Sequence, residues 1–507
     1  MNDQIQEDIQ RWPKSYKEAQ KRALVFKSLK SIVHTKPSEL EVFQTYDQTL
    51  LELHPILREP TETEKEGYSQ VMFQGNPWSS LNSIPFALLF LSIYKTYIVP
   101  GATILLPIIT LFLPYLLLKT MYNIPIQFGE YTKILWRLWN GKALPTKPED
   151  FLNAVDTEPI DTITVLKKLA QNSWTLVTLG QAIWIPIQQA RHFRKLDVEC
   201  EGFGEKICRI RDIGIGLHER WKEYFPSWFS VWIELCPNTS RQAFAFFQEY
   251  PYWFYHTKRA IQRFHILYKL SRRPDVTPVT FVDSKTPILM LKEFGDPNIA
   301  YEDRVLSSIK SKGHTIVTGP NRGGKSSFLR GILQSIQFAH AYGAVYAKKA
   351  EMSYFTWIAD GLKLEDRPGK TSMFEREVEF ATNVLNKNDG KGIVFYDELF
   401  HSTNPPDAER TSRIFCRDLW KKKNCLSFIS THVYGLAKDA PEEVQTLCLA
   451  SWKTREDEYI FSYGIQKGIC TVSSVDLLLQ EHGWNLYADK MSCAEAEGNK
   501  KACIRQE

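Results

Sequence analysis

The pattern of apolar and polar residues along this 507-residue chain changes near residue 288. Before that point, apolar residues recur at helical spacing, most clearly in residues 16–33, 161–195 and 241–273. After it, short runs of β-branched and apolar residues alternate with helical patterns, which is typical of α/β domains. The sequence therefore predicts a mostly helical region followed by an α/β domain.

One long apolar run interrupts the helical region. Residues 84–118 contain a single charged residue, Lys95, and the 23 residues from 96 to 118 contain none. As one helix, the uncharged part would be about 35 Å long, compared with a bilayer hydrocarbon thickness of roughly 30 Å. The run therefore predicts a transmembrane segment, with a core helix of a large soluble domain as the alternative.

Two membrane topologies are consistent with this run. Pro100-Gly101 is a turn signal in its middle and favours a hairpin with both ends on the cytosolic side. An acidic flank before the run and a basic, aromatic flank after it favour a single span with the N-terminus outside. We prefer the hairpin because residues 1–80 resemble an ordinary cytosolic helical region without an export signal. The expected location is a membrane, with the α/β domain on its cytosolic side.

The amino-acid composition excludes only a few classes of protein. Hydrophobic residues make up 43% and charged residues 24% of the chain, which indicates a folded rather than a disordered protein. The formal net charge of +5 permits nucleic-acid binding but does not indicate it. The nine cysteines form no C-x-x-C pair, which indicates reduced thiols in a cytosolic compartment and no zinc site.

The strongest chemical signal lies in the α/β part. Residues 319–326 read G-P-N-R-G-G-K-S, which fits the phosphate-binding pattern G-x-x-x-x-G-K-[ST]. A β-branched run precedes them and a helical pattern, residues 327–344, follows. Backbone N–H groups and a helix N-terminus would bind phosphate, Lys325 would reach the β and γ oxygens, and the Ser326 hydroxyl would bind Mg²⁺. The predicted nucleotide-binding residues are Gly319, Pro320, Asn321, Arg322, Gly323, Gly324, Lys325, Ser326 and Ser327.

Two further motifs supply catalytic groups. The apolar strand 392–396 ends in Asp397, which would hold Mg²⁺ through water, and Glu398, which would polarise the attacking water as a general base. A second apolar run, residues 426–429, precedes Ser430-Thr431-His432, and His432 can hydrogen-bond a γ-phosphate. With Lys325, Glu398 and His432 as catalytic residues, the sequence predicts an ATP hydrolase that uses ATP and Mg²⁺.

Ser372 opens a predicted helix that runs to about residue 386. One interpretation is an ordinary N-terminal capping box, because Glu375 stands three positions further on. The other is that Ser372 and the helix N-terminus contact the γ-phosphate of a nucleotide bound to a second subunit. The second interpretation requires a dimer.

Together these motifs resemble the MutS family of DNA mismatch-repair ATPases, which belongs to the ABC class of dimeric ATPases. The resemblance rests on the forms T-G-P-N-x-x-G-K-[ST], S-x-F-x-x-E, D-E and S-T-H, and covers roughly residues 288–485. It implies a homodimer with ATP held between the phosphate loop of one subunit and Ser372 of the other. Residues 121–275 resemble the family's lever and core helices more weakly.

The chain also departs from the family pattern. A mismatch-recognition domain with its Phe-x-Glu wedge is missing, and residues 399–407 differ from the usual G-R-G-T-S segment. A membrane segment stands where the DNA-reading domain would be expected. The L-S-G-G-Q signature of ABC transporters is absent as well.

These observations predict five regions and one preferred function. The regions are an N-terminal helical region (1–80), a transmembrane segment (81–120), a lever- and core-like helical region (121–287), a MutS-like ATPase domain (288–485) and a tail (486–507). The expected function is ATP hydrolysis in a dimeric composite site that drives movement of a membrane-tethered helical region. The alternatives are a DNA-binding repair or recombination factor and, disfavoured because one hairpin cannot build a substrate path, a transport-type ABC ATPase.

Overall fold

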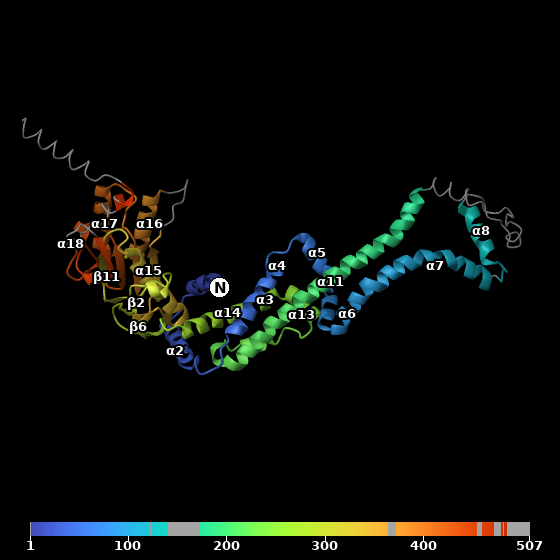
Figure 1. The fold of residues 1–507 in the computed structure, drawn as a ribbon, viewed down its shortest axis with the longest axis horizontal. Coiled ribbons are helices and arrows are strands. Elements are labelled where there is room, and N and C mark those ends of the chain that lie inside the picture. Colours follow the sequence, from blue (N-terminus) through green and yellow to red (C-terminus); the bar gives the residue numbers. More distant parts are fainter. Residues whose placement is uncertain are drawn as a thin grey trace, which may run out of the picture. The chain divides into compact units, whose positions relative to one another are not determined.

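The computed structural model describes residues 2–121, 123–139, 173–363, 372–453, 459–470, 478–479 and 481–483. The chain forms two compact units (Figure 1). The first, which we call the sheet unit, combines residues 1–38 with the chain from Gln262 onward. The second, the helical unit, is Glu39–Ile261. The predicted C-terminal tail, residues 486–507, lies outside the described residues.

The sheet unit contains two β-sheets. A six-stranded sheet has the order β11-β10-β4-β9-β8-β7, with β10, β4, β9, β8 and β7 parallel and β11 antiparallel at one edge. A five-stranded sheet has the order β3-β2-β6-β1-β5. The strands are β1 (Thr277–Val282), β2 (Leu289–Phe294), β3 (Ser307–Ser311), β4 (His314–Thr318), β5 (Ala344–Val345), β6 (Ala347–Ser353), β7 (Trp357–Gly361), β8 (Gly392–Tyr396), β9 (Cys425–Ser430), β10 (Gln445–Lys453) and β11 (Tyr459–Lys467).

Helices connect and cover these strands, which confirms the predicted α/β architecture. They are α1 (Asn2–Gln10), α2 (Tyr16–Ile32), α15 (Lys325–Tyr342), α16 (Met373–Asn386), α17 (Pro405–Leu419) and α18 (Tyr434–Lys438), with a short 3₁₀ helix at Tyr301–Asp303. α14 (Pro251–Arg272) contains the boundary between the two units.

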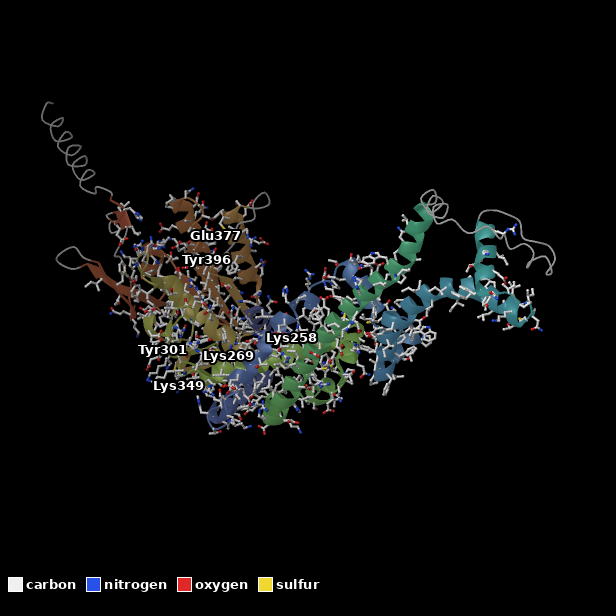
Figure 2. All side chains as sticks on the ribbon, turned by 45° about the vertical axis from the view of Figure 1, so that its right-hand side comes forward. Lys258, Lys269, Tyr301, Lys349, Glu377 and Tyr396 are labelled. Carbon is white, nitrogen blue, oxygen red and sulfur yellow. The ribbon has the colours of Figure 1, made fainter. Side chains whose placement is uncertain are left out.

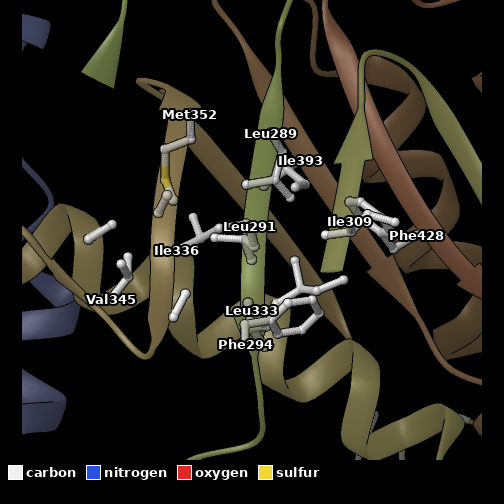
Figure 3. Close-up of a cluster of buried hydrophobic side chains, with 14 of the residues drawn as sticks. Leu289, Leu291, Phe294, Ile309, Leu333, Ile336, Val345, Met352, Ile393 and Phe428 are labelled. Carbon is white, nitrogen blue, oxygen red and sulfur yellow. The ribbon is translucent and has the colours of Figure 1, made fainter. Parts of the chain in front are cut away.

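One apolar core joins the two sheets to α15. Strands β4, β8 and β9 are buried along their whole length, as expected for central parallel strands. Figure 3 shows side chains of β2, including Leu291, meeting Ile336 of α15, and Ile309 of β3 meeting Phe428 of β9. Each such side chain contributes about 1.5–3 kcal/mol when it is fully buried. This core fixes the position of the loop between β4 and α15.

The N-terminal residues pack onto the same unit. Ala19 and Ala23 of α2 belong to the core around α15. Trp12 donates from Nε1 to the Phe355 carbonyl at 2.6 Å, and Tyr16 donates from its hydroxyl to the Phe281 carbonyl at 3.1 Å. The buried carboxylate of Asp8 accepts a hydrogen bond from the Tyr342 hydroxyl at 3.0 Å. Residues 1–38 are therefore part of the sheet unit.

The structure thus divides the chain differently from the five predicted regions. Residues 1–38 do not group with residues 39–80, because small side chains on α2 allow close packing against α15. The predicted boundary at residue 288 also falls too late, because β1 (Thr277–Val282) pairs in parallel with β6. Neither contact has a local sequence signal.

The helical unit contains only helices within its described residues, as predicted for that half. They are α3 (Leu40–Glu52), α4 (His54–Leu57), α5 (Glu62–Gln70), α6 (Pro85–Ile93), α7 (Val99–Thr120), α8 (Phe128–Trp139), α11 (Ser173–Trp221), α12 (Phe229–Ile233) and α13 (Ser240–Glu249), with short 3₁₀ helices at Trp78–Ser83 and Lys222–Tyr224. The buried carboxylate of Glu39 accepts hydrogen bonds from Arg220 at 2.7 and 2.9 Å and from Trp221 at 3.0 Å. These bonds tie the start of α3 to the end of α11.

The aromatic stretch predicted as one helix, residues 241–273, is two helices. α13 ends at Glu249 and α14 begins at Pro251, because proline fits the first turn of a helix but not its interior. Phe244, Trp253 and Phe254 are buried, while Tyr252 is 75% exposed. Most of these aromatic rings therefore form core.

The long apolar run is helical from Pro85 to Thr120. A π-helical turn, Tyr94–Ile98, joins α6 to α7, with the Val99 N–H bonded to the Tyr94 carbonyl. The predicted turn at Pro100-Gly101 is therefore wrong. Pro100 lies in the first turn of α7 directly after the wide π turn, where its missing N–H costs least.

Within the described residues, one helix is long and apolar enough to cross a membrane, judged by length and composition only. It spans Pro85–Thr110 with a mean hydropathy of 1.5 in its most apolar window. Core helices of soluble proteins meet the same criteria, but they are mostly buried. Only 11% of this window is buried.

The close packing at Gly343, the C-terminal cap of α15, predicts an effect on stability. Gly343 has a left-handed φ of 72°, and a Cβ there would lie 2.4 Å from the Ala23 Cα. We expect Gly343→Ala to destabilise the protein by about 1–3 kcal/mol, because both the backbone conformation and the α2 contact would be strained. Thermal unfolding measures the change.

Gly464→Ala in β11 is the matched control, because a Cβ at that position would come no closer than 3.6 Å to its nearest neighbour. It should unfold near the wild-type temperature. Equal melting temperatures for the two variants would show that α2 does not pack tightly against the end of α15.

Candidate functional site

The phosphate-type loop leaves the carboxyl end of β4, in the interior of the six-stranded sheet. Residues 319–324 form a tight turn, and α15 begins at Lys325. Gly324 has a left-handed φ of 91°, and a Cβ on Gly323 would lie 2.9 Å from the Pro320 carbonyl oxygen. No side chain caps the start of α15. The first N–H groups of this 18-residue helix are therefore available for an anion.

Lys325 is folded into the loop. It is buried, and its Nζ donates to the carbonyl oxygens of Gly319 at 3.0 Å and Pro320 at 3.1 Å. Burial lowers the pKa of Lys325, and the nearby charges of Glu398 and Asp397 oppose this shift. The ammonium group therefore lies in the loop near Asp397, the predicted magnesium ligand, and Glu398, the predicted catalytic base.

Ser430 bonds the carboxylate of Asp397 and the backbone of Glu398. Asp397 and Glu398 directly follow β8, and Ser430 is the last residue of the neighbouring strand β9. The Ser430 hydroxyl donates to Asp397 Oδ1 and accepts from the Glu398 N–H at 3.0 Å. Glu398 has a left-handed φ of 55°, a conformation that costs a non-glycine residue about 1 kcal/mol or more. Such strain is typical of residues whose direction matters for function.

His432 completes the cluster. Its Nε2 lies 3.4 Å from Glu398 Oε1. Burial is the main cause that lowers the pKa of His432, the Lys325 charge adds to it, and Glu398 opposes it. A lowered pKa keeps the ring neutral at neutral pH, so it can serve as a hydrogen-bond partner rather than as a cation. The structure thus brings Lys325, Asp397, Glu398 and His432 together as the sequence suggests.

A hollow of about 530 Å³ lies over the loop. All loop residues from Pro320 to Ser327 line it, with Glu398 on one side. Its volume is within the range of small-molecule sites. Two parts of the wall of the hollow belong to no motif that the sequence shows. They are Tyr463 of β11 and the segment before β3, with Asp303 and Arg304.

The side chains also suit a magnesium–nucleotide complex. Ser326 is exposed and lines the main hollow, and Asp397 lines a smaller hollow of about 240 Å³ that shares Glu398 with the first. Among the described residues, no three His, Cys, Asp or Glu side chains are grouped to hold a metal by themselves. This pattern fits Mg²⁺, which is usually held by one or two protein groups together with phosphate oxygens and water.

Ser372 forms the predicted capping box of α16. Its hydroxyl accepts from the Glu375 N–H at 3.2 Å, and Glu375 Oε2 accepts from the Ser372 N–H at 2.8 Å. Ser372 is exposed and does not line the hollow over the phosphate loop of its own chain. Its predicted contact with a nucleotide on a second subunit remains a prediction.

Glu377, the last position of the S-x-F-x-x-E motif, received no role from the sequence. It is fully buried and lines the small hollow with Tyr396 (Figure 2). Ser402 donates to its carboxylate, and His401 Nδ1 lies 3.1 Å from Glu377 Oε1. Glu377 therefore holds the loop after Glu398 in place, which is the segment that departs from the family pattern.

Comparisons with known proteins agree with this geometry. Residues 315–477 match the family model of MutS domain V. The DNA mismatch repair protein MutS of Psychrobacter cryohalolentis is 30% identical over 141 residues, which are 27% of this chain and 13% of that protein. The DNA mismatch repair protein MSH7 of Arabidopsis thaliana is 28% identical over 171 residues, 31% of this chain and 15% of that protein. MutS of Prochlorococcus marinus is 28% identical over 162 residues, 30% of this chain and 17% of that protein.

These matches are confined to one part of each protein. The chain spans only 13–17% of the length of the curated relatives it matches. The matched region includes β4, the phosphate loop, Asp397, Glu398 and His432. The C-terminal part of this chain is therefore similar to MutS domain V, which is a P-loop ATPase domain.

Proposed function

We propose that this chain is a membrane-tethered ATPase that works as a dimer, in which ATP binding and hydrolysis move the helical unit. The observation that supports it most is the cluster of Lys325, Asp397, Glu398 and His432 around the phosphate loop of a domain V match.

Each residue of the cluster has a role in hydrolysis. The N–H groups of the loop and of the first turn of α15 bind phosphate oxygens, and Lys325 turns from the loop carbonyls to the β and γ oxygens. Ser326 and Asp397 would hold Mg²⁺, which would supply positive charge against the phosphate oxygens. Glu398 polarises the attacking water, and neutral His432 hydrogen-bonds the γ-phosphate and keeps Glu398 oriented.

The dimer supplies the remaining contact. Ser372 is exposed at the N-terminus of α16, a 14-residue helix with N–H groups and a positive dipole end. Because Ser372 does not line the hollow of its own chain, a second copy is the natural source of the nucleotide that it meets. ATP between two copies would close the dimer, and hydrolysis would open it.

Membrane attachment is supported by the apolar helix Pro85–Thr110 and by an uncharged stretch of α11 beside it. Residues 173–190, the first part of α11, carry no charged side chain, and neither do residues 96–118. α11 runs antiparallel to α6 and α7, because Ser92 bonds Asp197 at 2.7 Å and Lys95 lies 5.5 Å from the Phe193 ring. The uncharged parts are about 27 and 35 Å long as helices, close to the thickness of a bilayer.

Several apolar side chains of this helix pair are exposed, as lipid contact requires. Gln181 and Gln189 line a hollow between α11 and α7, and both are exposed. Ile183 and Trp184 of α11 are more than half exposed, as are Leu105 and Ile109 of α7. The charged residues of α11 begin at Arg191, near the end of the pair where α6 lies, so α6 and the charged part of α11 would lie on one side of the membrane and α8 on the other. We propose that the side of α6 is the cytosol.

A DNA-repair function is the other possibility, because the relatives are named as DNA mismatch repair proteins. An aromatic, basic helix can stack on single-stranded nucleic acid. Residues 241–273 favour this only weakly, because Phe244, Trp253 and Phe254 are buried and only some of the rings, such as that of Tyr252, are exposed. A transport-type ATPase has no supporting observation in the described residues.

The nucleotide site generates the first functional prediction. Lys325→Ala should weaken ATP binding by about 100-fold or more, because it removes the charge that meets the phosphates. Glu398→Gln should bind ATP normally but hydrolyse it about 10²–10⁴-fold more slowly, because the base is lost. Equilibrium binding of a fluorescent ATP analogue and steady-state phosphate release measure the two effects.

Glu442→Gln, at an exposed position before β10, is the control for Glu398→Gln because it makes the same charge change. It should keep wild-type turnover. Normal turnover in the Glu398→Gln protein would refute the assigned role of Glu398.

The composite site is tested by mixing inactive chains. Ser372→Arg should block hydrolysis but leave ATP binding to the separate chain unchanged. Mixed with Lys325→Ala chains it should regain about a quarter of wild-type activity, because half of the dimers then have one intact site. The control mixture pairs Ser372→Arg with the double variant Ser372→Arg/Lys325→Ala, which offers no intact site. If crosslinking shows mixed dimers and no activity returns, Ser372 does not act across the dimer.

Membrane attachment is tested by extraction with alkaline carbonate. The full chain should stay in the membrane pellet. Replacing Leu105, Ile109 and Leu113 of α7 by glutamate should release it, because each charge at the bilayer centre costs about 2.5–3.5 kcal/mol.

The matched control places glutamates at three other exposed apolar residues, Leu24, Leu51 and Val231, and should remain in the pellet. Ile183→Glu with Trp184→Glu tests the second helix in the same way. Release of the wild-type chain by carbonate would rule out the transmembrane pair. α7 would then be a helix exposed to water.

A further inference from the structure

A second hollow lies at the edge of the six-stranded sheet opposite the phosphate loop. His314, Cys425 and Gln445 begin the adjacent parallel strands β4, β9 and β10, and all three line this hollow. The phosphate loop leaves the other end of β4. The hollow has a volume of about 830 Å³ and shares no lining residue with the hollow over the phosphate loop. It is therefore a separate site from the proposed ATP site.

The lining of this hollow is strongly basic. The positive charges come from the end of β3, from the connection between β3 and β4, and from the connection between α17 and β9. Glu443 is the one carboxylate among the lining residues, which gives the lining a formal charge of +4. The whole 507-residue chain has a formal charge of only +5. The lining lysines are Lys310, Lys312, Lys421, Lys422 and Lys423.

Most of these lysines are not neutralised within the fold. Lys421 pairs with Asp418 at 3.0 Å, while Lys422 donates to the Lys387 carbonyl at 2.9 Å and to Asn388 Oδ1 at 2.7 Å. In the part of the chain that the structure describes, no carboxylate lies within ion-pair distance of Lys310, Lys312 or Lys423. Positive charges held together without counter-charges repel one another and attract an anion.

The two loops are short and held by hydrogen bonds. The Lys422 N–H bonds the Leu419 carbonyl at 3.0 Å, and the Asn424 amide donates to the carbonyls of Asn388 at 3.0 Å and Gly390 at 2.9 Å. Buried His314 bonds Ser427 through Nδ1 at 2.9 Å and anchors the other loop. The lysine backbones are therefore already in place before any ligand binds, which reduces the ordering cost of binding.

The wall of this hollow contains one more hydrogen-bond donor. Trp420 lines the hollow, and its buried indole Nε1–H has no hydrogen-bond partner within the described structure. An unpaired buried N–H is costly, and an acceptor oxygen in the hollow would satisfy it after a small shift of the wall.

We propose that this hollow binds a small anion that carries several phosphate groups. Lysine ammonium groups bind phosphates as point charges, and five of them around one compact hollow fit several phosphates on a single ring or short chain. The volume of about 830 Å³ is within the range of small-molecule sites, so a compact ligand fits the hollow better than a long nucleic-acid duplex. The ligand is either a free polyphosphate or the phosphorylated head group of a lipid, which share this chemistry.

The test uses the full chain in detergent, with the nucleotide site filled by excess non-hydrolysable ATP analogue. Isothermal titration with inositol hexakisphosphate should show binding that weakens as salt increases. Lys312→Ala/Lys423→Ala should weaken it by about tenfold or more, because two unpaired charges are lost. The charge-preserving variant Lys312→Arg/Lys423→Arg should bind within about threefold of wild type.

Lys348→Ala/Lys349→Ala is the matched control, because it removes two exposed lysines from β6 of the same unit and makes the same charge change. It should bind like wild type, and all variants should keep wild-type ATPase activity. Equal binding by the Lys312→Ala/Lys423→Ala protein would overturn the proposal.

Competition identifies the source of the phosphates. Displacement by water-soluble dioctanoyl phosphatidylinositol bisphosphate, but not by inositol bisphosphate, would assign the site to a lipid head group. The reverse order would assign it to a free polyphosphate. If duplex DNA displaces the probe more strongly per phosphate as its length increases, the site is a nucleic-acid surface and the proposal is wrong.

Discussion

The register of three adjacent parallel strands determines where the catalytic groups of this protein lie. Val317 of β4 pairs with Ser430 of β9, and Tyr396 of β8 pairs with Ile429 of the same strand. The phosphate loop, the carboxylates after β8 and the end of β9 therefore meet at one edge of the sheet. A shift of one residue would face the side chains of a strand toward the other side of the sheet and would separate Ser430 from Asp397.

The same parallel arrangement gives the sheet two chemically different edges. At the carboxyl edge, a helix N-terminus and Lys325 provide positive potential beside two carboxylates, which suits a nucleotide held with Mg²⁺. At the amino edge, five lysines and only one carboxylate line the hollow, which suits a second phosphate-bearing ligand. β4 connects the two edges over five buried residues. A ligand at one edge could therefore be sensed at the other through a stiff element rather than through a mobile loop.

The sequence predicts the site better than the architecture. The phosphate loop, Asp397, Glu398 and His432 could be located because each follows an apolar strand in a fixed local pattern. Glu377 and Ser430 were part of recognised motifs, but their roles depend on contacts that no local pattern encodes. The packing of Ala19 and Ala23 against α15 and the grouping of Lys312 with Lys423 join segments far apart in the chain. Pro100 was misjudged because a π turn before it removes the usual cost of proline in a helix.

In the proposed dimer, each hydrolytic site is formed by two copies of this chain. The most direct test is the rate of ATP hydrolysis per chain, measured with Mg²⁺ over a wide range of protein concentrations. The account predicts that the rate per chain rises with concentration and reaches a plateau as dimers form, and that a chelator abolishes it. A rate per chain that stays constant down to concentrations where sedimentation shows only monomers would contradict the account.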